Sequence, residues 1–300
     1  MNIYTGLLFT CLVTVCAGAG NSTWDYNSLG SDWPKNYEYC GGKRQSPVDI
    51  KDANCSHTLK NSITFTNYDQ AGSEPFKFEN NGHSVVLSTS TTGAKIKLGT
   101  LGTFTLVQLH FHWGKDNEKG SEHTLEGKAY PAEMHLVHKN DKYSTLGEAI
   151  KKGDGLAVLG VFIKVGEKNS AYEFLKNTSS ITKSGKNTTV NPFAMKILLP
   201  ENRNIFYRYL GSLTTPTCDE AVIWTVFKQE IELDEDQLNQ FRILQDSKNK
   251  SLVDNYRSVL DIGDRPITYW DDDCPVPDGA EAITASIFSL LLSFLLFTLN

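Results

Sequence analysis

The sequence has no excess of basic residues and no sign of a second domain. Its 29 Lys and Arg against 35 Asp and Glu give a formal net charge of −6, which provides no basic surface for nucleic acid. It also lacks internal repeats, low-complexity linkers and breaks in composition. We therefore expect one large domain that does not bind nucleic acid.

Several motifs of common enzyme and metal sites are also missing. There is no Cys-x-x-Cys pair, no His-Glu-x-x-His and no Gly-x-Ser-x-Gly. The first absence argues against a cysteine-held structural zinc. The other two make a zinc protease or an esterase the weakest of the enzymatic interpretations.

The two ends of the chain are short of charge. The first twenty residues are apolar and include the small-residue run Ala17-Gly18-Ala19, which predicts a signal peptide over 1–19 although its start lacks the usual Lys or Arg. The other end, 275–300, reads as a short polar spacer and an uncharged apolar tail, which favours a removed signal for a glycolipid (GPI) anchor. Attachment is expected near Asp278-Gly279-Ala280, or nearer Asp272 to Cys274. A spanning helix, which usually has a basic cytoplasmic flank, is the alternative.

The remaining 20–274 has the features of a protein that passes through the secretory pathway. Removing the signal leaves four cysteines, which allow three pairings in an oxidising compartment: Cys40, Cys55, Cys218 and Cys274. Five Asn-x-Ser/Thr sequons are candidate glycosylation sites: Asn21, Asn54, Asn177, Asn187 and Asn249. We expect an extracellular protein, either secreted or held on the outer face of the plasma membrane by a lipid anchor.

Short β-prone segments dominate the chain. Segments bounded by Gly, Asn or Asp turns predict strands at 62–67, 76–79, 84–88, 103–113, 132–139, 156–165 and 221–227. Helical spacing is limited to brief pieces near 145–152, 170–176 and 234–244, the last with Asp234 as a possible cap. The fold class is therefore mainly β, a sheet-centred domain with short peripheral helices.

Histidines are concentrated in one part of the sequence. Six of the seven lie between 83 and 138, whereas composition alone would scatter them. Strand alternation puts His110 and His112 on one face, where His135 of a neighbouring strand can join them. Three neutral imidazoles leave the fourth position of a tetrahedral zinc open, as a catalytic site requires. An isolated His-x-His is more often surface or packing, so the clustering carries this hypothesis.

Several motifs together resemble the α-class carbonic anhydrases, in that family's order and at close to its spacing. They are Gln45-Ser46-Pro47-Val48-Asp49-Ile50, Asn81-Gly82-His83, Gln108-x-His110-x-His112-Trp113-Gly114, Ser121-Glu122-His123-Thr124, Glu133-x-His135-x-Val137-His138, 155–160 and Ser212-Leu213-Thr214-Thr215-Pro216 with Trp224. The resemblance covers roughly Trp24 to Pro266, and the two apolar ends make the chain similar to the secreted or lipid-anchored members.

The resemblance implies a fold, a metal and a reaction. The fold is a large, twisted, mostly antiparallel sheet with one Zn²⁺ held by His110, His112 and His135. The enzyme is a carbonate dehydratase, a zinc lyase that converts CO2 to bicarbonate and a proton when zinc-bound hydroxide attacks CO2. Sulfonamide-type inhibitors are expected to bind.

Roles for the surrounding residues also follow from the resemblance. Thr214 and Glu122 orient the hydroxide, and Gln108 and Glu133 hold ligand imidazoles from positions two residues before a ligand. The apolar CO2 wall is Val137, Val158, Leu213 and Trp224, with Thr215 beside bicarbonate. His83, in an accessible turn, is the proton shuttle, and Tyr26 and Asn81 order its water chain. His123 is a buried structural histidine, and His138 packs or faces solvent.

The resemblance also bears on Val86, on the cysteine pairing and on a competing class of protein. Val86 departs from the family, in which many members carry an amide there, and so makes that side of the cleft drier. Cys40 and Cys218 match the disulfide of extracellular members, and Cys55 and Cys274 are left to pair with each other. A catalytically silent binding module is the competing class, but such modules usually lack a ligand, whereas all three are present here.

Overall fold

The computed structural model describes residues 24–89, 92–271 and 273–275. Its strands are β1 Asp49–Ile50, β2 Asn54–Cys55, β3 Ile63–Thr66, β4 Phe76–Asn80, β5 Val85–Ser88, β6 Lys95–Leu98, β7 Thr103–Trp113, β8 Thr124–Leu125, β9 Ala132–Asn140, β10 Leu156–Val165, β11 Asn187–Val190, β12 Phe206–Gly211, β13 Val222–Phe227, β14 Ile231–Leu233 and β15 Thr268–Trp270. Its α-helices are α1 Leu146–Ala149 and α2 Glu235–Arg242, and its 3₁₀ helices are η2 Trp33–Lys35, η3 Glu38–Gly41, η4 His57–Leu59, η6 Gly99–Leu101, η7 Ser170–Ser180 and η8 Met195–Leu198.

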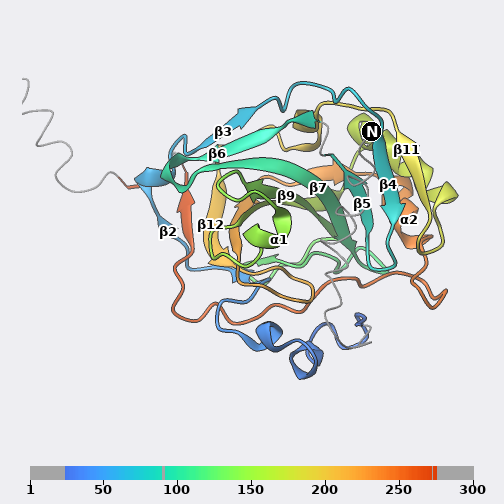
Figure 1. The fold of residues 1–300 in the computed structure, drawn as a ribbon, viewed down its shortest axis with the longest axis horizontal. Coiled ribbons are helices and arrows are strands. Elements are labelled where there is room, and N and C mark those ends of the chain that lie inside the picture. The colour runs from blue at the N-terminus through green and yellow to red at the C-terminus, as the bar shows by residue number, and fades with distance from the viewer. Residues whose placement is uncertain (1–23, 90–91, 272, 276–300) are drawn as a thin grey trace, which may run out of the picture.

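One large sheet organises the molecule (Figure 1). It has thirteen strands in the order β11-β4-β5-β7-β9-β10-β13-β12-β15-β2, with β14 on β10 and with β3 and β6 joined to β7 through β6. Neighbours are mostly antiparallel, and the parallel pairs in this sheet are β10 with β13, β10 with β14, and β15 with β2. The expected mainly β, mostly antiparallel fold is confirmed.

A β-bulge in β7 sets which side chains face which side of the sheet. The pairing of β7 with β9 shifts register between Leu106 and Gln108. The same buried cluster contains the even-numbered Phe104 and Leu106 before the shift and the odd-numbered Leu109 after it. The extra residue thus reverses the alternation. Because of this reversal, the even-numbered residues 108, 110 and 112 face away from that cluster.

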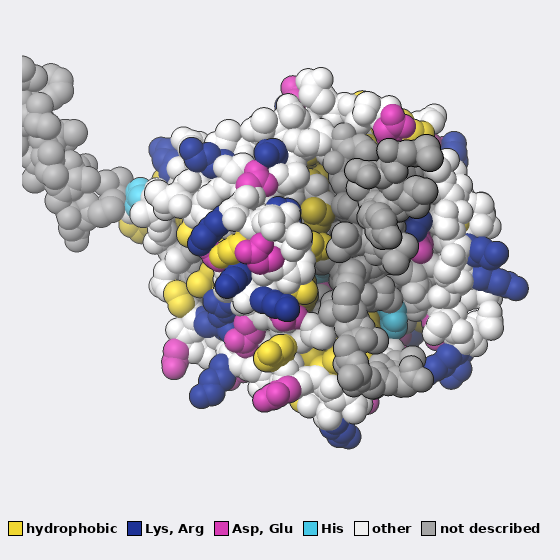
Figure 2. Space-filling model, in the orientation of Figure 1, with side chains coloured by type: hydrophobic (Ala, Val, Ile, Leu, Met, Phe, Trp, Pro, Cys, Tyr) yellow, Lys and Arg dark blue, Asp and Glu magenta, His cyan; other side chains and the backbone are white. Residues whose placement is uncertain are grey.

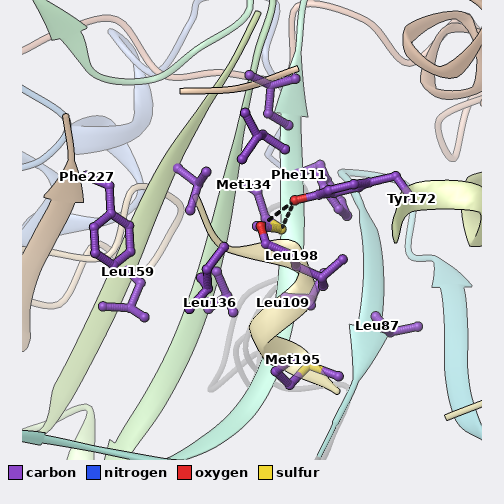
Figure 3. Close-up of a cluster of buried hydrophobic side chains, with 14 of the residues drawn as sticks. Leu87, Leu109, Phe111, Met134, Leu136, Leu159, Tyr172, Met195, Leu198 and Phe227 are labelled. Atoms are coloured by element: carbon purple, nitrogen blue, oxygen red, sulfur yellow. Dashed lines mark hydrogen bonds between the residues drawn. The ribbon is translucent and has the colours of Figure 1, made fainter. Parts of the chain in front are cut away.

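Apolar side chains pack on both faces of the sheet. The larger cluster lies against η7 and η8, and Figure 3 shows its centre, where the Tyr172 hydroxyl donates to the Leu198 carbonyl at 2.7 Å beside Met134. The smaller cluster lies on the opposite face and contains Val137, Val158 and Trp224. The alternation of β9 and β10 between these two clusters makes both strands almost wholly buried.

The longest strands and the capped helix lie where the sequence predicts them. The bounds of β7 and β10 are as predicted, and α2 begins after Asp234, whose side chain accepts from the Gln237 N–H at 2.8 Å in a capping box. The segment 170–176 is a 3₁₀ helix extended to Ser180 rather than an α-helix. Strands β1, β2, β6, β8, β11, β12, β14 and β15 were not predicted; β11 is a polar edge strand without apolar alternation.

Figure 2 shows acidic and basic side chains interspersed over one face of the domain. Among the residues that the structure describes, no helix has the length and apolarity to cross a membrane. The predicted signal peptide at 1–19 and the apolar tail within 276–300 lie outside the described residues.

Candidate metal centre

The three predicted ligand histidines converge. His110 on β7 pairs directly with His135 on β9, and His112 is two residues further along β7. The ring centroid of His110 lies 5.0 Å from that of His112 and 5.2 Å from that of His135, and the last two are 4.7 Å apart. One nitrogen from each ring falls within 4.8 Å of the others.

Each of these imidazoles has one nitrogen engaged by an acceptor, which fixes the position of its proton. His110 Nδ1 donates to Gln108 Oε1 at 3.0 Å, His112 Nδ1 to the carbonyl of Asn255 at 2.7 Å, and His135 Nε2 to Glu133 Oε1 at 2.8 Å. An N–H on one side leaves a lone pair on the other. The nitrogens left for a metal are therefore Nε2 of His110, Nε2 of His112 and Nδ1 of His135.

The protonation state of the rings also suits a metal. Burial lowers the pKa of His112 to about 3 and also lowers the pKa of His110 and His135, so the imidazoles are neutral at pH 7, as metal ligation requires. Two buried polar atoms at the centre, His112 Nε2 and Glu122 Oε2, have no hydrogen-bond partner and lie 3.3 Å apart. This donor set fits Zn²⁺.

A second trio of potential ligands, His123, Glu133 and His135, is better explained as a hydrogen-bond network. The two Glu133 oxygens receive the N–H groups of Glu122 and His123 at 2.9 and 2.8 Å and the rings of His123 and His135 at 2.7 and 2.8 Å. The other His123 nitrogen lies 2.6 Å from the Tyr209 hydroxyl. Both ring nitrogens of His123 have hydrogen-bond partners, so neither is left for a metal. His123 is therefore structural, as the sequence indicated.

Glu122 connects the centre to the threonine loop. The Thr214 hydroxyl lies close enough to Glu122 to lower the pKa of its carboxyl, and the Arg257 backbone N–H donates to Glu122 Oε1 at 2.9 Å. Burial raises the pKa of Glu122, and these two donors oppose the rise. The Arg257 guanidinium in turn bonds Gln45 Oε1 and the carbonyls of Ser46 and Cys40. Arg257 has no counterpart among the sequence predictions.

A cavity of about 20 Å³, roughly the space of one water, opens over the three histidines. The other residues that line it are Tyr26, Ser84, Val137, Val158, Leu213, Thr214, Thr215 and Trp224. All four predicted wall residues are among them. Sequence reasoning missed Ser84, whose hydroxyl donates to the Phe111 carbonyl at 2.6 Å.

His83 is half-buried in the predicted turn and lines a surface cavity. Its ring stacks on Trp24 with centroids 3.9 Å apart, and burial lowers its pKa to about 4. Asn81 holds this turn, because its Oδ1 accepts the N–H groups of His83 and Ser84. The turn was predicted correctly, but the packing of Trp24 against it has no local sequence signal.

The remaining predicted neighbours also reach the site. Val86 on β5 pairs with His110, so the departure from the family places an apolar side chain beside a predicted ligand. The Tyr26 hydroxyl lines the cavity and is buried without a hydrogen-bond partner. His138 is fully buried, bonded to the Tyr68 hydroxyl and to the Ala157 carbonyl, so it packs rather than facing solvent.

Two disulfides are present. Cys40 pairs with Cys218, with Cα atoms 4.9 Å apart, and Cys55 pairs with Cys274. The first joins η3 to the loop that carries Thr214, and Gln45 Nε2 adds a bond to the Cys218 carbonyl at 3.2 Å. Oxidised cysteines are typical of proteins of the secretory pathway.

The sequons differ in their surroundings. Asn54, Asn187 and Asn249 are exposed. The Asn177 side chain is partly buried and donates to the Phe174 carbonyl at 2.8 Å within η7, and Asn21 lies outside the described residues.

The bond to Gln108 gives a specific prediction about metal affinity. Gln108→Leu removes the acceptor that orients the His110 ring, and we expect zinc affinity to fall roughly 10- to 100-fold. Competition with a chelator, followed by fluorescence, measures the change. Gln70→Leu, an exposed glutamine on the turn after β3, is the matched control. Equal affinities in the two variants would show that the Gln108 bond does not support the ligand.

The fold and the site define a class: a large β domain with an open three-histidine centre inside a partly apolar cleft. The family model for eukaryotic-type carbonic anhydrase matches residues 28–270. Carbonic anhydrase 12 of Homo sapiens is 34% identical over 263 residues, covering 83% of this chain and 73% of the relative. Carbonic anhydrase 1 of Mus musculus is 40% identical over 229 residues, covering 74% and 87%. The chain belongs to the carbonic anhydrase family, and it is a carbonic anhydrase.

Proposed function

We propose that this chain catalyses the zinc-dependent, reversible hydration of CO2 to bicarbonate and a proton, with zinc held by His110, His112 and His135. The observation that supports this most directly concerns the ring nitrogens. In each of the three imidazoles one nitrogen donates to a fixed acceptor, and the other nitrogen is left for the metal. Zinc bound by three neutral imidazoles lowers the pKa of a bound water toward neutrality, an effect for which carbonic anhydrases are themselves the standard example.

Thr214 and Glu122 are proposed to aim the attacking oxygen. The Thr214 hydroxyl, which lowers the pKa of the Glu122 carboxyl, is proposed to give its only proton to that carboxylate, so that its oxygen acts only as an acceptor toward the nucleophile. That acceptor selects the orientation in which a lone pair of the nucleophile faces the carbon of CO2. The Arg257 backbone N–H donates to Glu122 Oε1. Glu122 is thereby kept as an acceptor, so the proton of Thr214 is directed toward it.

The cleft wall is proposed to receive CO2. Val137, Val158, Leu213 and Trp224 are buried and line the cavity above the histidines. CO2 has no charge, so an apolar surface binds it without a desolvation penalty for the protein. Thr215 is the polar group beside this wall, where the bicarbonate product gains hydrogen bonds, and the same cleft would accept sulfonamide-type inhibitors.

His83 is proposed to carry the proton to solvent. Stacked on Trp24, with its pKa lowered to about 4 by burial, the ring is a poor proton acceptor at neutral pH. Moving off Trp24 into water would restore a pKa near 6.5 and allow transfer. Tyr26 and Asn81 are proposed to order the water between the ring and the metal, and Val86 makes one side of that path drier.

This role predicts a buffer-dependent defect. His83→Ala should lower kcat at low buffer concentration at least about tenfold, because no other side chain at the rim is proposed to accept the proton. Added imidazole should restore the rate. Stopped-flow CO2 hydration measures both, with His57→Ala, a histidine far away beside Trp270, as control. An unchanged rate in weak buffer would place the proton route elsewhere.

The mature domain is proposed to be residues 20–274, acting outside the cell. Its two disulfides agree with an oxidising compartment. The charge-poor end of the chain supports removal of 275–300 and attachment of a GPI anchor. Cys274 is tied to Cys55 on β2, so the end of the domain would be fixed close to the attachment point. Among the sequons, the exposed Asn54, Asn187 and Asn249 are the proposed carriers of glycans.

Anchoring has a direct test in expressing cells. A phosphatidylinositol-specific phospholipase should release most of the activity into the medium, and a chain ended after Cys274 should appear in the medium without treatment. Western blotting and CO2 hydration of both fractions measure the outcome. Full retention after phospholipase treatment would favour a spanning helix.

A further inference from the structure

A second cavity, of about 450 Å³, lies on the sheet face opposite the histidine centre. It is lined by β3 and the residues on either side of it, by η8, and by the chain from η8 to the start of β12, and its lining includes Ser62, Phe65, Tyr68, Lys196, Arg203 and Phe206. Tyr68 bonds His138 of β9, whose side chain alternates with His135 and Val137 and so faces away from the zinc ligands. The volume is within the range of small-molecule sites.

Basic side chains outnumber acidic ones in the lining of this cavity. Lys196 and Arg203 line it, and neither forms an ion pair with a carboxylate of the described residues; Arg203 Nη1 donates to the Pro200 carbonyl at 2.7 Å. Asp69 is the one acidic residue of the lining. A cavity with two unpaired cations and one acid is electropositive, which favours an anion.

A third cation lies behind the aromatic wall. Arg208 is 7% exposed, and its guanidinium lies 5.2 Å from the ring centroid of Phe206, which lines the cavity. Its Nε donates to Thr225 Oγ1 at 2.8 Å, but its Nη2 is buried without a partner. A buried guanidinium with no carboxylate is costly, and an anion nearby would offset that cost.

The lining also offers a neutral donor and apolar surface. Ser62 Oγ is buried and has no hydrogen-bond partner, so its hydroxyl is free to donate to a ligand. Phe65, Leu199 and Phe206 supply the apolar walls. A purely inorganic anion would leave these walls without contacts.

We infer that this cavity binds a small organic carboxylate, its charged group held by Lys196, Arg203 and the Ser62 hydroxyl and its apolar body packed on Phe65, Leu199 and Phe206. The site is separate from the zinc centre and does not depend on the proposed reaction. It would give the enzyme a second ligand besides its substrate.

Benzoate and its neutral isostere benzamide are suitable probes. Isothermal titration of the full chain should show benzoate binding, and benzamide should bind at least tenfold more weakly. Lys196→Gln with Arg203→Gln should weaken benzoate at least tenfold, because each removes a charge-assisted bond. Lys151→Gln, an exposed lysine on the turn after α1, is the matched control. Every titration contains a saturating sulfonamide, which occupies the zinc cleft and keeps both probes out of it.

Thr64→Trp, at an exposed position of β3, fills the cavity without removing a charge and should abolish benzoate binding. Circular dichroism and thermal melting confirm that each variant is folded, and CO2 hydration should be unchanged in all of them. The inference is overturned by equal binding of benzoate and benzamide, by full benzoate affinity in the double glutamine variant, or by full affinity in Thr64→Trp.

Discussion

Replacing His135 with Ala is expected to remove stoichiometric zinc and to lower CO2 hydration by at least about a thousandfold. Two imidazoles remain in that variant, and Glu133 loses the ring to which it is bonded, so neither the metal nor its position is kept. Inductively coupled plasma mass spectrometry gives the zinc content, and stopped-flow assay gives the rate, on the same sample.

The control for this substitution is His57→Ala. His57 is bonded to the Pro275 carbonyl and packs on Trp270, remote from β7 and β9. It should keep one zinc per chain and full activity. Retention of high activity by a metal-free His135→Ala protein would contradict the proposed centre.

The second large effect concerns the proposed hydrogen bond from Thr214 to Glu122. Thr214→Val preserves shape but removes the hydroxyl, and we expect kcat/KM to fall about 100-fold with zinc content unchanged, because the nucleophile loses its orienting acceptor. Glu122→Gln should give a loss of similar size, because an amide can donate to Thr214 and reverse the direction of that hydrogen bond.

The two substitutions should also be non-additive. If Thr214 acts through Glu122, the double variant should be little slower than either single variant. Losses that multiply would mean that the two side chains act independently. Loss of zinc from Thr214→Val would show instead that the residue supports the metal site rather than the reaction.

The sequence was sufficient to predict that the three proposed ligands lie together, because their convergence depends on local geometry. His110, His112 and His135 occur in strands whose bounds are marked by β-prone runs, and Gln108 and Glu133 lie two residues from the rings they bind, a separation that strand alternation preserves. Family resemblance then predicted the pairing of Thr214 and Glu122, which are 92 positions apart in the chain but close enough for Thr214 to lower the pKa of Glu122.

The rest of the site depends on backbone groups and distant packing. Asn255 supplies a carbonyl to His112, and Arg257 an N–H to Glu122, across 143 and 135 residues. Every residue except proline has both groups, so no side-chain pattern identifies these positions. The burial of His83 likewise arises from Trp24, nearly sixty positions earlier.

The bulge in β7 is the most consequential feature that the alternation argument did not foresee. A regular strand would keep even-numbered residues on the side of Phe104 and Leu106, in the larger cluster. The extra residue near Val107 turns His110 and His112 to the other face. The predicted ligand face was therefore right within 108–112, while the side of the sheet on which it lies is set by the bulge.

The most direct test of the account is zinc analysis combined with stopped-flow CO2 hydration on the purified, unmodified chain, with and without a sulfonamide. We predict one zinc per chain, hydration that disappears when a chelator removes the metal and returns with added zinc, and inhibition by the sulfonamide. A folded protein that binds zinc but does not hydrate CO2 would contradict the account and identify a silent binding module instead.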